Sequence, residues 1–600
     1  MRLVFCAILS ATFMLAACQS AEPETAGPPL GVWVWEAEEA ESRLEIRISE
    51  ENDIWRAQVQ SAPAEIIAEG SRLSIKAPLG QSFSGEVSTD RKMITGRWHQ
   101  PGTELAYSEM VTLVSIPLTG EKRWEGKVDL QPRPFRVFLD VFEDETDGIS
   151  AVIRNPERNE IMRATRFRIE SGDKGQWALV AGSGERQIRQ SLGFVDGQLQ
   201  LDHNWFAAPL ALRPATSSDL TRYYARDLER EPITYSPPAA LDDGWNVARA
   251  EDAGFDTAAL DALVAELSQL DPRSPRPRLL HALLVAYKGQ LVMEEYFYGH
   301  DRNTVHDTRS LGKVFAPVLV GALQQQRFAI DAEDRPIPGV LATAGERLDD
   351  PRKAGVSLAQ LMSFTSGLDC DDNRDSPGSE DRLWSQQDED DFWLYTAKLA
   401  LLHEPGTRYA YCSASINLVG ARLREVGEQP INELFDEMIA RPLGFGPYHW
   451  SVAPNGAAYL GGGPYMRPRD ILKIGAMHAA NGQWNGQQIL DPLWVDESTS
   501  TFIDITPETT GTTQEVFDNY YSGGGVAYEW STDEIRVGDR SYKSYAASGN
   551  GGQVLVVVPE LDLTVLLMGG NYRQYGIWGR WRDDLIGGHI IPAISKSNSR

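Results

Sequence analysis

The spacing of hydrophobic residues changes near residue 215, and this change limits the folds open to the 600-residue chain more than any other feature. From residue 30 to about residue 215, apolar and polar residues alternate in short runs, such as residues 43–49 and 136–142, that are separated by polar turns. An alternation with a period of two predicts half-buried β-strands. Beyond this region, runs with helical spacing are mixed with β-like runs. We therefore expect all-β modules followed by a domain of helices and strands, since the chain is too long for one core.

A loose repeat divides the β-rich half. The segments that carry it are Gly31-Val-Trp33 with Thr95-Gly-Arg-Trp98, and Trp124-Glu-Gly126 with Asp202-His-Asn-Trp205. The repeat predicts two small β-sandwich or barrel-like modules in tandem, at residues 30–118 and 119–215. One larger β-domain is the alternative.

A polar stretch at residues 216–243, which contains two adjacent prolines, predicts a linker to a domain at residues 244–600. Leucines at helical spacing predict a helix within residues 252–270. A hairpin follows, with Lys288-Gly289 as its turn, and the chain closes with apolar runs at residues 553–558 and 563–568. Strands at both ends with helices between them favour an α/β (α+β) domain with an antiparallel sheet flanked by helices.

Ser310 and Lys313 are the first candidates for chemistry. A serine hydroxyl is a poor nucleophile without an adjacent base, and residues i and i+3 of a helix share one face, so Lys313 can reach Ser310. The pattern S-x-x-K alone is expected about once by chance in such a chain. A second copy, Ser171 to Lys174, contains a Gly-Asp turn instead of a helical run. Ser310 precedes an apolar run at residues 314–323, although Pro317 inside that run disfavours a helix unless it lies in the first turn.

Two downstream segments accompany this pair in a fixed order. Residues 405–420 begin with Pro-Gly and contain Tyr411-Cys412-Ser413, and residues 548–559 form a Gly-rich turn that enters a buried strand. With these motifs, residues 240–590 resemble the superfamily of class C β-lactamases, D-alanyl-D-alanine peptidases and serine esterases, especially its 6-aminohexanoate-dimer-hydrolase-like members. The further matching stretches are residues 362–372, 461–463, 469–470, 481–486 and 559–562.

The resemblance implies a mechanism. Ser310 would attack an ester or amide carbonyl and form an acyl-enzyme, while Lys313 and Tyr411 move the proton. The same reasoning predicts that the pKa values of both Lys313 and Tyr411 are lowered. The oxyanion hole would use the backbone N–H of Ser310 and one near Gly549 or Asn550.

The third motif, at Ala547-Ser548-Gly549 or one residue earlier, departs from the family pattern. It has no Lys or His, and Ser413 replaces the usual Asn of the second motif. We expect Ser413 and Ser548 to line the substrate site together with Gly549 and Asn550. The missing cation makes β-lactams and D-Ala-D-Ala peptides poorer substrates. This favours an esterase, amidase or peptidase over a β-lactamase or D-Ala-D-Ala carboxypeptidase. A non-catalytic envelope protein that binds a partner through the same cleft is the alternative outside the enzymes.

Composition and the N-terminus suggest where the protein works. A formal net charge of −28 argues against nucleic acid as a partner. Residues 1–17 read as a secretory signal, and Leu15-Ala-Ala-Cys18 resembles the bacterial lipobox, with ordinary signal-peptidase cleavage as the alternative. Cys18 would then carry lipid, residues 18–29 would form a tether, and the protein would be an exported bacterial lipoprotein of the cell envelope, held at the membrane by its anchor alone. A small ester, amide or peptide is the expected substrate.

Two cysteines are left after Cys6 in the signal and the lipidated Cys18. In an oxidising compartment, Cys370 and Cys412 are expected to form a disulfide beside Tyr411. We expect no metal or other cofactor, because no Cys/His cluster with ligand spacing is present. Isolated histidines such as His306 and His403 are expected to be structural. Asp371-Asp372 is interpreted as a solvated loop, with cation binding as the alternative.

Overall fold

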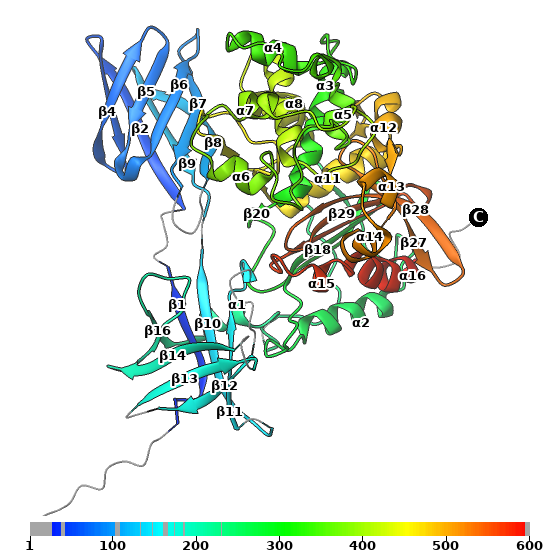
Figure 1. The fold of residues 1–600 in the computed structure, drawn as a ribbon. Coiled ribbons are helices and arrows are strands. Elements are labelled where there is room, and N and C mark those ends of the chain that lie inside the picture. The colour runs from blue at the N-terminus through cyan, green and yellow to red at the C-terminus, as the bar shows by residue number, and fades with distance from the viewer. Residues whose placement is uncertain are drawn as a thin grey trace, which may run out of the picture. The chain divides into compact units, whose positions relative to one another are not determined.

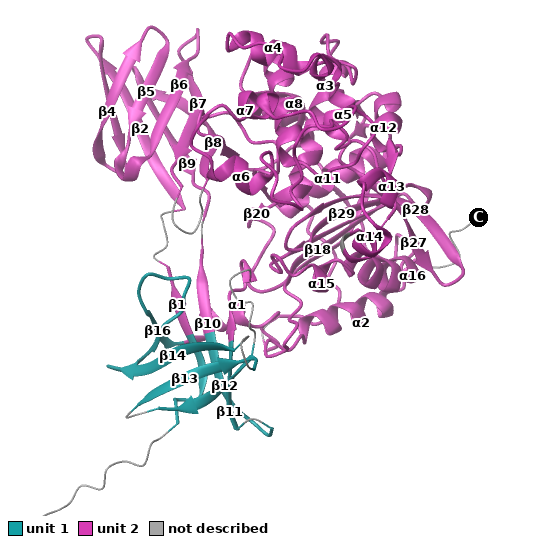
Figure 2. Cartoon of the chain, viewed as in Figure 1, with its two compact units in different colours: residues 1–33, 139–152, 166–214 teal, residues 34–138, 153–165, 215–600 magenta. Residues whose placement is uncertain are grey.

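The computed structural model describes residues 27–37, 42–102, 108–132, 134–146, 148–159, 166–172, 175–183, 187–229, 231–521 and 523–594. The chain forms two compact units (Figure 2). The first unit comprises residues 1–33, 139–152 and 166–214. The second comprises residues 34–138, 153–165 and 215–600. The predicted signal segment and Cys18 lie outside the described residues.

Eight antiparallel strands of the second unit form a ring that closes through the pairing of β8 with β9. The strands are β2 (Arg43–Glu51), β3 (Ile54–Val59), β4 (Ala62–Glu69), β5 (Arg72–Lys76), β6 (Ser82–Val87), β7 (Met93–Gln100), β8 (Glu109–Gly120) and β9 (Arg123–Asp129), with η1 (Pro78–Gly80) between β5 and β6. Their alternating pattern places one face inward, where Trp98 and Trp124 are fully buried. Two of the four tryptophans of the sequence repeat thus lie in one core.

A second closed barrel has the strand order β1-β10-β11-β12-β13-β14-β15-β16. Its strands are β1 (Gly31–Glu36), β10 (Arg136–Asp144), β11 (Gly148–Arg154), β12 (Arg166–Ser171), β13 (Gln176–Ala181), β14 (Ile188–Val195), β15 (Gln198–Leu201) and β16 (Leu210–Pro214). This topology differs from the tandem boundaries expected at residues 30–118 and 119–215. The strand β1 belongs to the second barrel and β9 to the first, so the first barrel is inserted between β1 and β10. The period of two identifies strands but not their partners, which explains the difference.

The C-terminal part is built on a nine-stranded sheet of order β17-β19-β18-β30-β29-β28-β27-β26-β25 (Figure 1). These strands are β17 (Asn246–Val247), β18 (Leu280–Tyr287), β19 (Gln290–Tyr296), β25 (Ile503–Asp504), β26 (Gly525–Val526), β27 (Ser531–Val537), β28 (Arg540–Gly549), β29 (Gln553–Val558) and β30 (Leu563–Gly569). All neighbours pair antiparallel except β17 with β19. A small hairpin joins β23 (Gln483–Trp484) to β24 (Gln487–Gln488).

Helices cover both faces of this sheet, so β18, β29 and β30 are mostly apolar and are buried at every position. Leu283 and Val285 of β18 face one core, and Leu284 with Ala286 faces the other. The first core is closed by α2 (Thr257–Ser268), α15 (Tyr575–Trp578), η8 (Arg582–Ile590) and α16 (Ile591–Ala593).

The second face carries the larger helical part of the domain. Its helices are α3 (Phe315–Gln325), α4 (Pro336–Thr343), η5 (Pro351–Gly355), α5 (Leu358–Met362), α6 (Glu380–Ser385), α7 (Phe392–Lys398), α8 (Ser413–Gly427), α9 (Ile431–Phe435), η6 (Asp436–Ala440), α10 (Arg441–Leu443), α11 (Pro468–Ala479), α12 (Pro492–Thr499), α13 (Pro507–Thr510) and α14 (Gln514–Tyr520). A short η7 (Pro559–Leu561) links β29 to β30. The fold therefore has the predicted antiparallel sheet between helical layers.

Two connections depart from simple linkers. The segment predicted as a linker at residues 216–243 contains α1 (Ser217–Tyr223), which begins with a capping box between Thr216 and Asp219. A small sheet also joins the first barrel to the helical part, because β8 continues past the barrel and pairs with β21 (His449–Val452). That sheet goes on through β22 (Pro464–Met466) to β20 (His306–Asp307), which immediately precedes Ser310.

Candidate active site

Ser310 and Lys313 lie on η4 (Arg309–Val314), a 3-10 helix that begins just after β20. A 3-10 helix has three residues per turn, so residues i and i+3 are aligned more closely than in an α-helix. The Lys313 Nζ donates a hydrogen bond to the Ser310 Oγ over 2.9 Å. Pro317 falls in the first turn of α3, where its missing N–H removes no helical hydrogen bond. The local sequence therefore tolerates the proline that weakened the helix prediction.

Lys313 makes two further contacts besides the hydrogen bond to Ser310. Its side chain is almost fully buried, and its ammonium also donates to the carbonyl oxygen of Gly461. The ring of Tyr411 lies 5.2 Å from Nζ, within the range of a cation–π contact. The structure thus brings together the three residues that the sequence predicted as catalytic.

Tyr411 sits directly before α8 and packs against Phe364, with ring centroids 4.7 Å apart. Burial raises the pKa of Tyr411 well above its usual value, and a hydrogen bond with Ser310 opposes this only in part. The sequence argument predicted a lowered pKa for Tyr411, and the structure contradicts it. Desolvation of the phenolate outweighs the nearby ammonium, so Tyr411 carries its proton at neutral pH.

The end of β28 lies against the nucleophile. A Cβ atom on Gly549 would come within 2.5 Å of the Thr308 carbonyl oxygen, so only glycine allows this approach. Ala547 points to the core on the side of η4, and Ser548 is exposed. Among the described residues, neither the N–H of Ser310 nor that of Asn550 donates a hydrogen bond to the protein. Both donors are therefore available beside Ser310, and their use as an oxyanion hole stays a prediction.

The disulfide between Cys370 and Cys412 is confirmed, with Cα atoms 5.5 Å apart. It ties the residue after Tyr411 to the loop that precedes α6. In the same place, the Asp372 N–H donates to the Tyr411 carbonyl oxygen over 2.8 Å. The bridge and this hydrogen bond together hold Tyr411 at the site.

Asp372 belongs to the site, which the sequence did not predict. Its carboxylate accepts hydrogen bonds from the Ser413 N–H at 2.9 Å and the Ser413 hydroxyl at 2.6 Å. Burial, reinforced by Glu380, raises the pKa of Asp372 to about 6, although Lys313 opposes the shift. The solvated loop expected at Asp371-Asp372 is therefore wrong for Asp372. No local signal marks this residue, because its partner Ser413 lies far away in the sequence.

Ser413 is fully buried, and its hydroxyl donates a hydrogen bond to the Asp372 carboxylate. Its predicted contact with substrate stays a prediction.

Glu529 is a second carboxyl that sequence reasoning missed. It is buried, it adopts a positive φ of 68°, and burial raises its pKa well above the usual value while Lys313 opposes this. Two carboxyl groups thus lie close enough to Lys313 for its charge to lower their pKa in part.

Residues 278–569 match the family model described as Beta-lactamase. These residues form a beta-lactamase-family domain. Members of this family are serine hydrolases, including esterases and peptidases.

The chain also has curated relatives. It is 27% identical over 154 residues to the D-alanyl-D-alanine-carboxypeptidase/endopeptidase AmpH of Escherichia coli K12, and equally so to that of strain O157:H7. The match covers 22% of this chain and 38% of each relative. The chain therefore spans about two fifths of the length of the curated relatives it matches.

Solved structures resemble the same region. A Bacillus anthracis protein assigned as a 6-aminohexanoate-dimer hydrolase is 18% identical, with a TM-score of 0.42, and the match covers 53% of this chain and 81% of that one. A beta-lactamase/D-alanine carboxypeptidase from Yersinia pestis is 16% identical, with a TM-score of 0.41, and the match covers 52% of this chain and 93% of that one.

The remaining candidates of the beta-lactamase-family domain are placed as follows. His306 is buried, and its Nε2 lies 2.8 Å from the Nδ1 of His281, in agreement with a structural role. His403 is exposed. Within the described ranges, no group of three His, Cys, Asp or Glu residues is arranged to hold a metal ion. No helix in the described part of the chain is long and apolar enough to cross a membrane.

Proposed function

We propose that this protein is a serine hydrolase that cleaves ester or amide bonds through an acyl-enzyme. The observation that carries the proposal is the 2.9 Å contact between the Lys313 Nζ and the Ser310 Oγ, inside a beta-lactamase-family domain and beside Tyr411. A base next to the hydroxyl is what a serine nucleophile requires.

The proposed reaction has two halves. The Ser310 Oγ attacks the carbonyl carbon, its proton passes to Lys313, which acts in this step as the neutral amine, and the N–H groups of Ser310 and Asn550 donate to the oxyanion. The bond to the leaving group then breaks, and Tyr411, which holds a proton at neutral pH, supplies the proton that the leaving group takes up. Lys313 then returns its proton to Tyr411, which restores the neutral amine. In the second half this amine takes a proton from the attacking water and passes it to the Ser310 Oγ as the acyl bond breaks, so the acid is released and Ser310 is restored. The sum is ester or amide plus water giving acid plus alcohol or amine.

The substrate class follows from β28. Ala547 stands where a third-motif cation is expected, so this position offers no charge to a β-lactam or D-Ala-D-Ala carboxylate. This supports an esterase, amidase or peptidase rather than a β-lactamase or D-Ala-D-Ala carboxypeptidase. The N-terminal motif supports an exported, lipid-anchored protein of the bacterial cell envelope, and with it a small ester, amide or peptide substrate.

Covalent labelling with a fluorophosphonate tests the proposal. The wild-type chain should be labelled, and Ser310→Ala should lose the label while it keeps the wild-type circular dichroism spectrum, because one partly exposed hydroxyl contributes little to packing. Lys313→Ala should slow acylation by about 10² or more, as removal of a general base does.

A panel of p-nitrophenyl esters, anilides and a cephalosporin then ranks the substrates. Faster turnover of the cephalosporin would contradict the proposed substrate class. Equal labelling of Ser310→Ala would contradict the nucleophile itself. A properly folded wild-type chain without labelling or turnover would favour the non-catalytic binding protein.

A further inference from the structure

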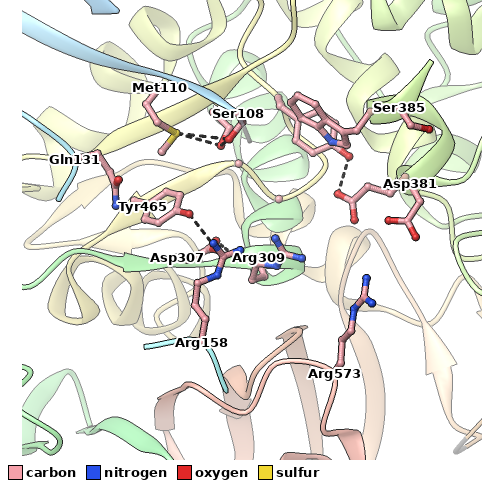
Figure 3. Close-up of a pocket in the computed structure, with 16 residues that line it drawn as sticks. Ser108, Met110, Gln131, Arg158, Asp307, Arg309, Asp381, Ser385, Tyr465 and Arg573 are labelled. Atoms are coloured by element: carbon pink, nitrogen blue, oxygen red, sulfur yellow. Dashed lines mark hydrogen bonds between the residues drawn. The ribbon is translucent and has the colours of Figure 1, made fainter. Parts of the chain in front are cut away.

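A cavity of about 400 Å³ lies beside the nucleophile, within the second unit. Figure 3 shows its lining residues, which come from the first barrel, from η4 and from the helical part. Neither the third motif nor the catalytic residues line it. It is therefore a space that the proposed mechanism has not used.

The cavity reaches the catalytic residues through a glycine loop. Gly462 and Gly463 line it, and the preceding Gly461 accepts the hydrogen bond from Lys313. A Cβ atom on Gly462 would lie 2.6 Å from the Arg309 carbonyl oxygen and 3.2 Å from the Ser310 nitrogen. A group bound in the cavity would thus lie next to the backbone of Ser310.

Arg309 is the cation at this end of the cavity. Among the described residues, its guanidinium forms no hydrogen bond or ion pair, and its nearest named contact is the ring of Tyr572, 5.7 Å away. The residue is held at a positive φ of 48°, which is costly for a side chain of this size and typical of functional sites. An arginine with free donors lining a cavity is suited to bind a carboxylate through its two-pronged geometry.

Three carboxylates, Asp307, Glu380 and Asp381, also line the cavity, and the first two accept hydrogen bonds from neutral donors. The Asp307 carboxylate accepts hydrogen bonds from the backbone N–H of Arg309 at 2.9 Å and from the Tyr465 hydroxyl at 3.2 Å. Glu380 accepts the Tyr459 hydroxyl at 2.9 Å. Burial alone would lower the pKa of Arg309, but Asp307 and Glu380 raise it above its usual value. The carboxylates thus keep Arg309 charged without using its side-chain donors.

Arg158 and Arg573 line the same cavity from two other segments of the chain (Figure 3). Arg573 is placed by its N–H, which donates to the Asn550 side chain at 2.7 Å. Asn550 is also the residue whose backbone N–H is free for the oxyanion. The arginines that line the cavity therefore contact the proposed catalytic residues at two points. Arg309 precedes Ser310 in the chain, and Arg573 is hydrogen-bonded to Asn550.

The first barrel supplies the opposite wall. Ser108 and Met110, at the beginning of β8, line the cavity together with Gln131. The Ser108 and Ser451 hydroxyls lie 3.2 Å apart, and the pairing of β8 with β21 fixes this wall to the catalytic domain. The barrel thus contributes directly to the space beside the nucleophile.

We propose that this cavity is a substrate subsite in which Arg309 binds a carboxylate, with the end of β8 as its outer wall. The inference rests on the proposed hydrolase function and names a substrate class for it. Because Arg309 precedes the nucleophile instead of lying on β28, the carboxylate is placed differently from one bound by a third-motif cation. The subsite therefore suits acids with an ester or amide bond nearby, and not the β-lactam geometry.

Matched esters test the subsite in the full-length protein. One pair varies the acyl group, p-nitrophenyl pentanoate against mono-p-nitrophenyl glutarate. The other varies the leaving group, phenyl pentanoate against 4-carboxyphenyl pentanoate. We expect the wild type to favour the carboxylate ester in one pair. Arg309→Gln should lower that preference, measured as the ratio of kcat/KM values, by about 10-fold or more, the usual worth of a charge-assisted hydrogen bond.

Three controls separate the possible outcomes. Arg309→Lys should restore part of the ratio, because it keeps a charge but loses the fork. Arg540→Gln, at an exposed arginine on β28, should leave the ratio unchanged. Two outcomes would overturn the subsite. One is that Arg309→Gln lowers kcat/KM equally for both esters of each pair, and the other is that the wild type shows no preference in either pair. If the wild type showed neither fluorophosphonate labelling nor hydrolysis of any ester, the proposed function itself would be overturned.

Discussion

At the scale of residues, the site combines motifs with side chains that no motif marks. Ser310, Lys313 and Tyr411 were predictable because each belongs to a short pattern whose order is informative. Asp372 and Glu529 were not, because a carboxylate in a polar stretch has the same sequence signature whether it is solvated or buried. Burial raises the pKa of both carboxyl groups, although Lys313 opposes the shift, and this leads to a measurable dependence on pH.

Asp372 should make the domain less stable as the pH rises. Its pKa is about 6 in the folded chain, against an ordinary value of 3.8, so the folded state binds more protons between these values. The free energy of unfolding should therefore fall by about 2 to 3 kcal/mol between roughly pH 4 and pH 7 on account of this group. Asp372→Asn should remove that part of the slope in urea titrations at several pH values.

Two controls accompany this measurement. Asp375→Asn changes an exposed carboxylate of the same loop whose pKa is lowered by Arg382, so it should leave the fall in place. Glu529 contributes in the same direction as Asp372, and Lys313 and Glu380 face the same region. An unchanged slope in Asp372→Asn would show that the carboxyl is not buried as described.

At the scale of elements, three short segments meet at the nucleophile. These are η4, the glycine end of β28 and the start of α8, and each is fixed by a backbone feature. The first turn of α3 accommodates Pro317, and Gly549 allows β28 to approach η4. The disulfide before α8 is the covalent link among these features, which makes it the element most open to a test.

Reduction of the Cys370–Cys412 bridge should lower activity before it unfolds the domain. The bridge spans a sequence separation of 42 residues, for which the loop-entropy estimate is about 4 kcal/mol. Since Cys412 follows Tyr411, its release should first loosen the site. Fluorophosphonate labelling and tryptophan fluorescence, followed together through a dithiothreitol titration, measure the two events. Coincident loss of both signals would contradict this order, and two free thiols in denatured, unreduced protein would exclude the bridge.

At the scale of the whole molecule, the first barrel interrupts the second and also extends a strand into the catalytic domain. A consecutive reading of the chain predicted two barrels in tandem and a separate enzyme. The topology instead places the end of β8 at the cavity beside Ser310. The remaining expectation at this scale is the lipid anchor at Cys18, which lies outside the described residues.

Cys18→Ser should release the full-length chain from the membrane fraction of a bacterial host. A diacylated cysteine binds membranes stably, whereas the bare tether offers no comparable apolar surface. Cell fractionation followed by immunoblotting measures the change. Cys6→Ser, in the predicted signal segment, is the matched control and should stay with the membrane. Release of both variants, or of neither, would contradict lipidation at Cys18.

The sequence by itself determined the local features of this protein: the strands of the barrels, the Lys288-Gly289 hairpin, the paired Ser310 and Lys313, and the cysteines free to bridge. These follow from periodicity, turn chemistry and spacing, which act over a few residues. Only the tertiary structure decided which strands close each barrel, that Asp372 meets Ser413, and that β8 and Arg309 share a cavity. Such contacts join distant segments, and their energy depends on burial and on partners that no local pattern encodes.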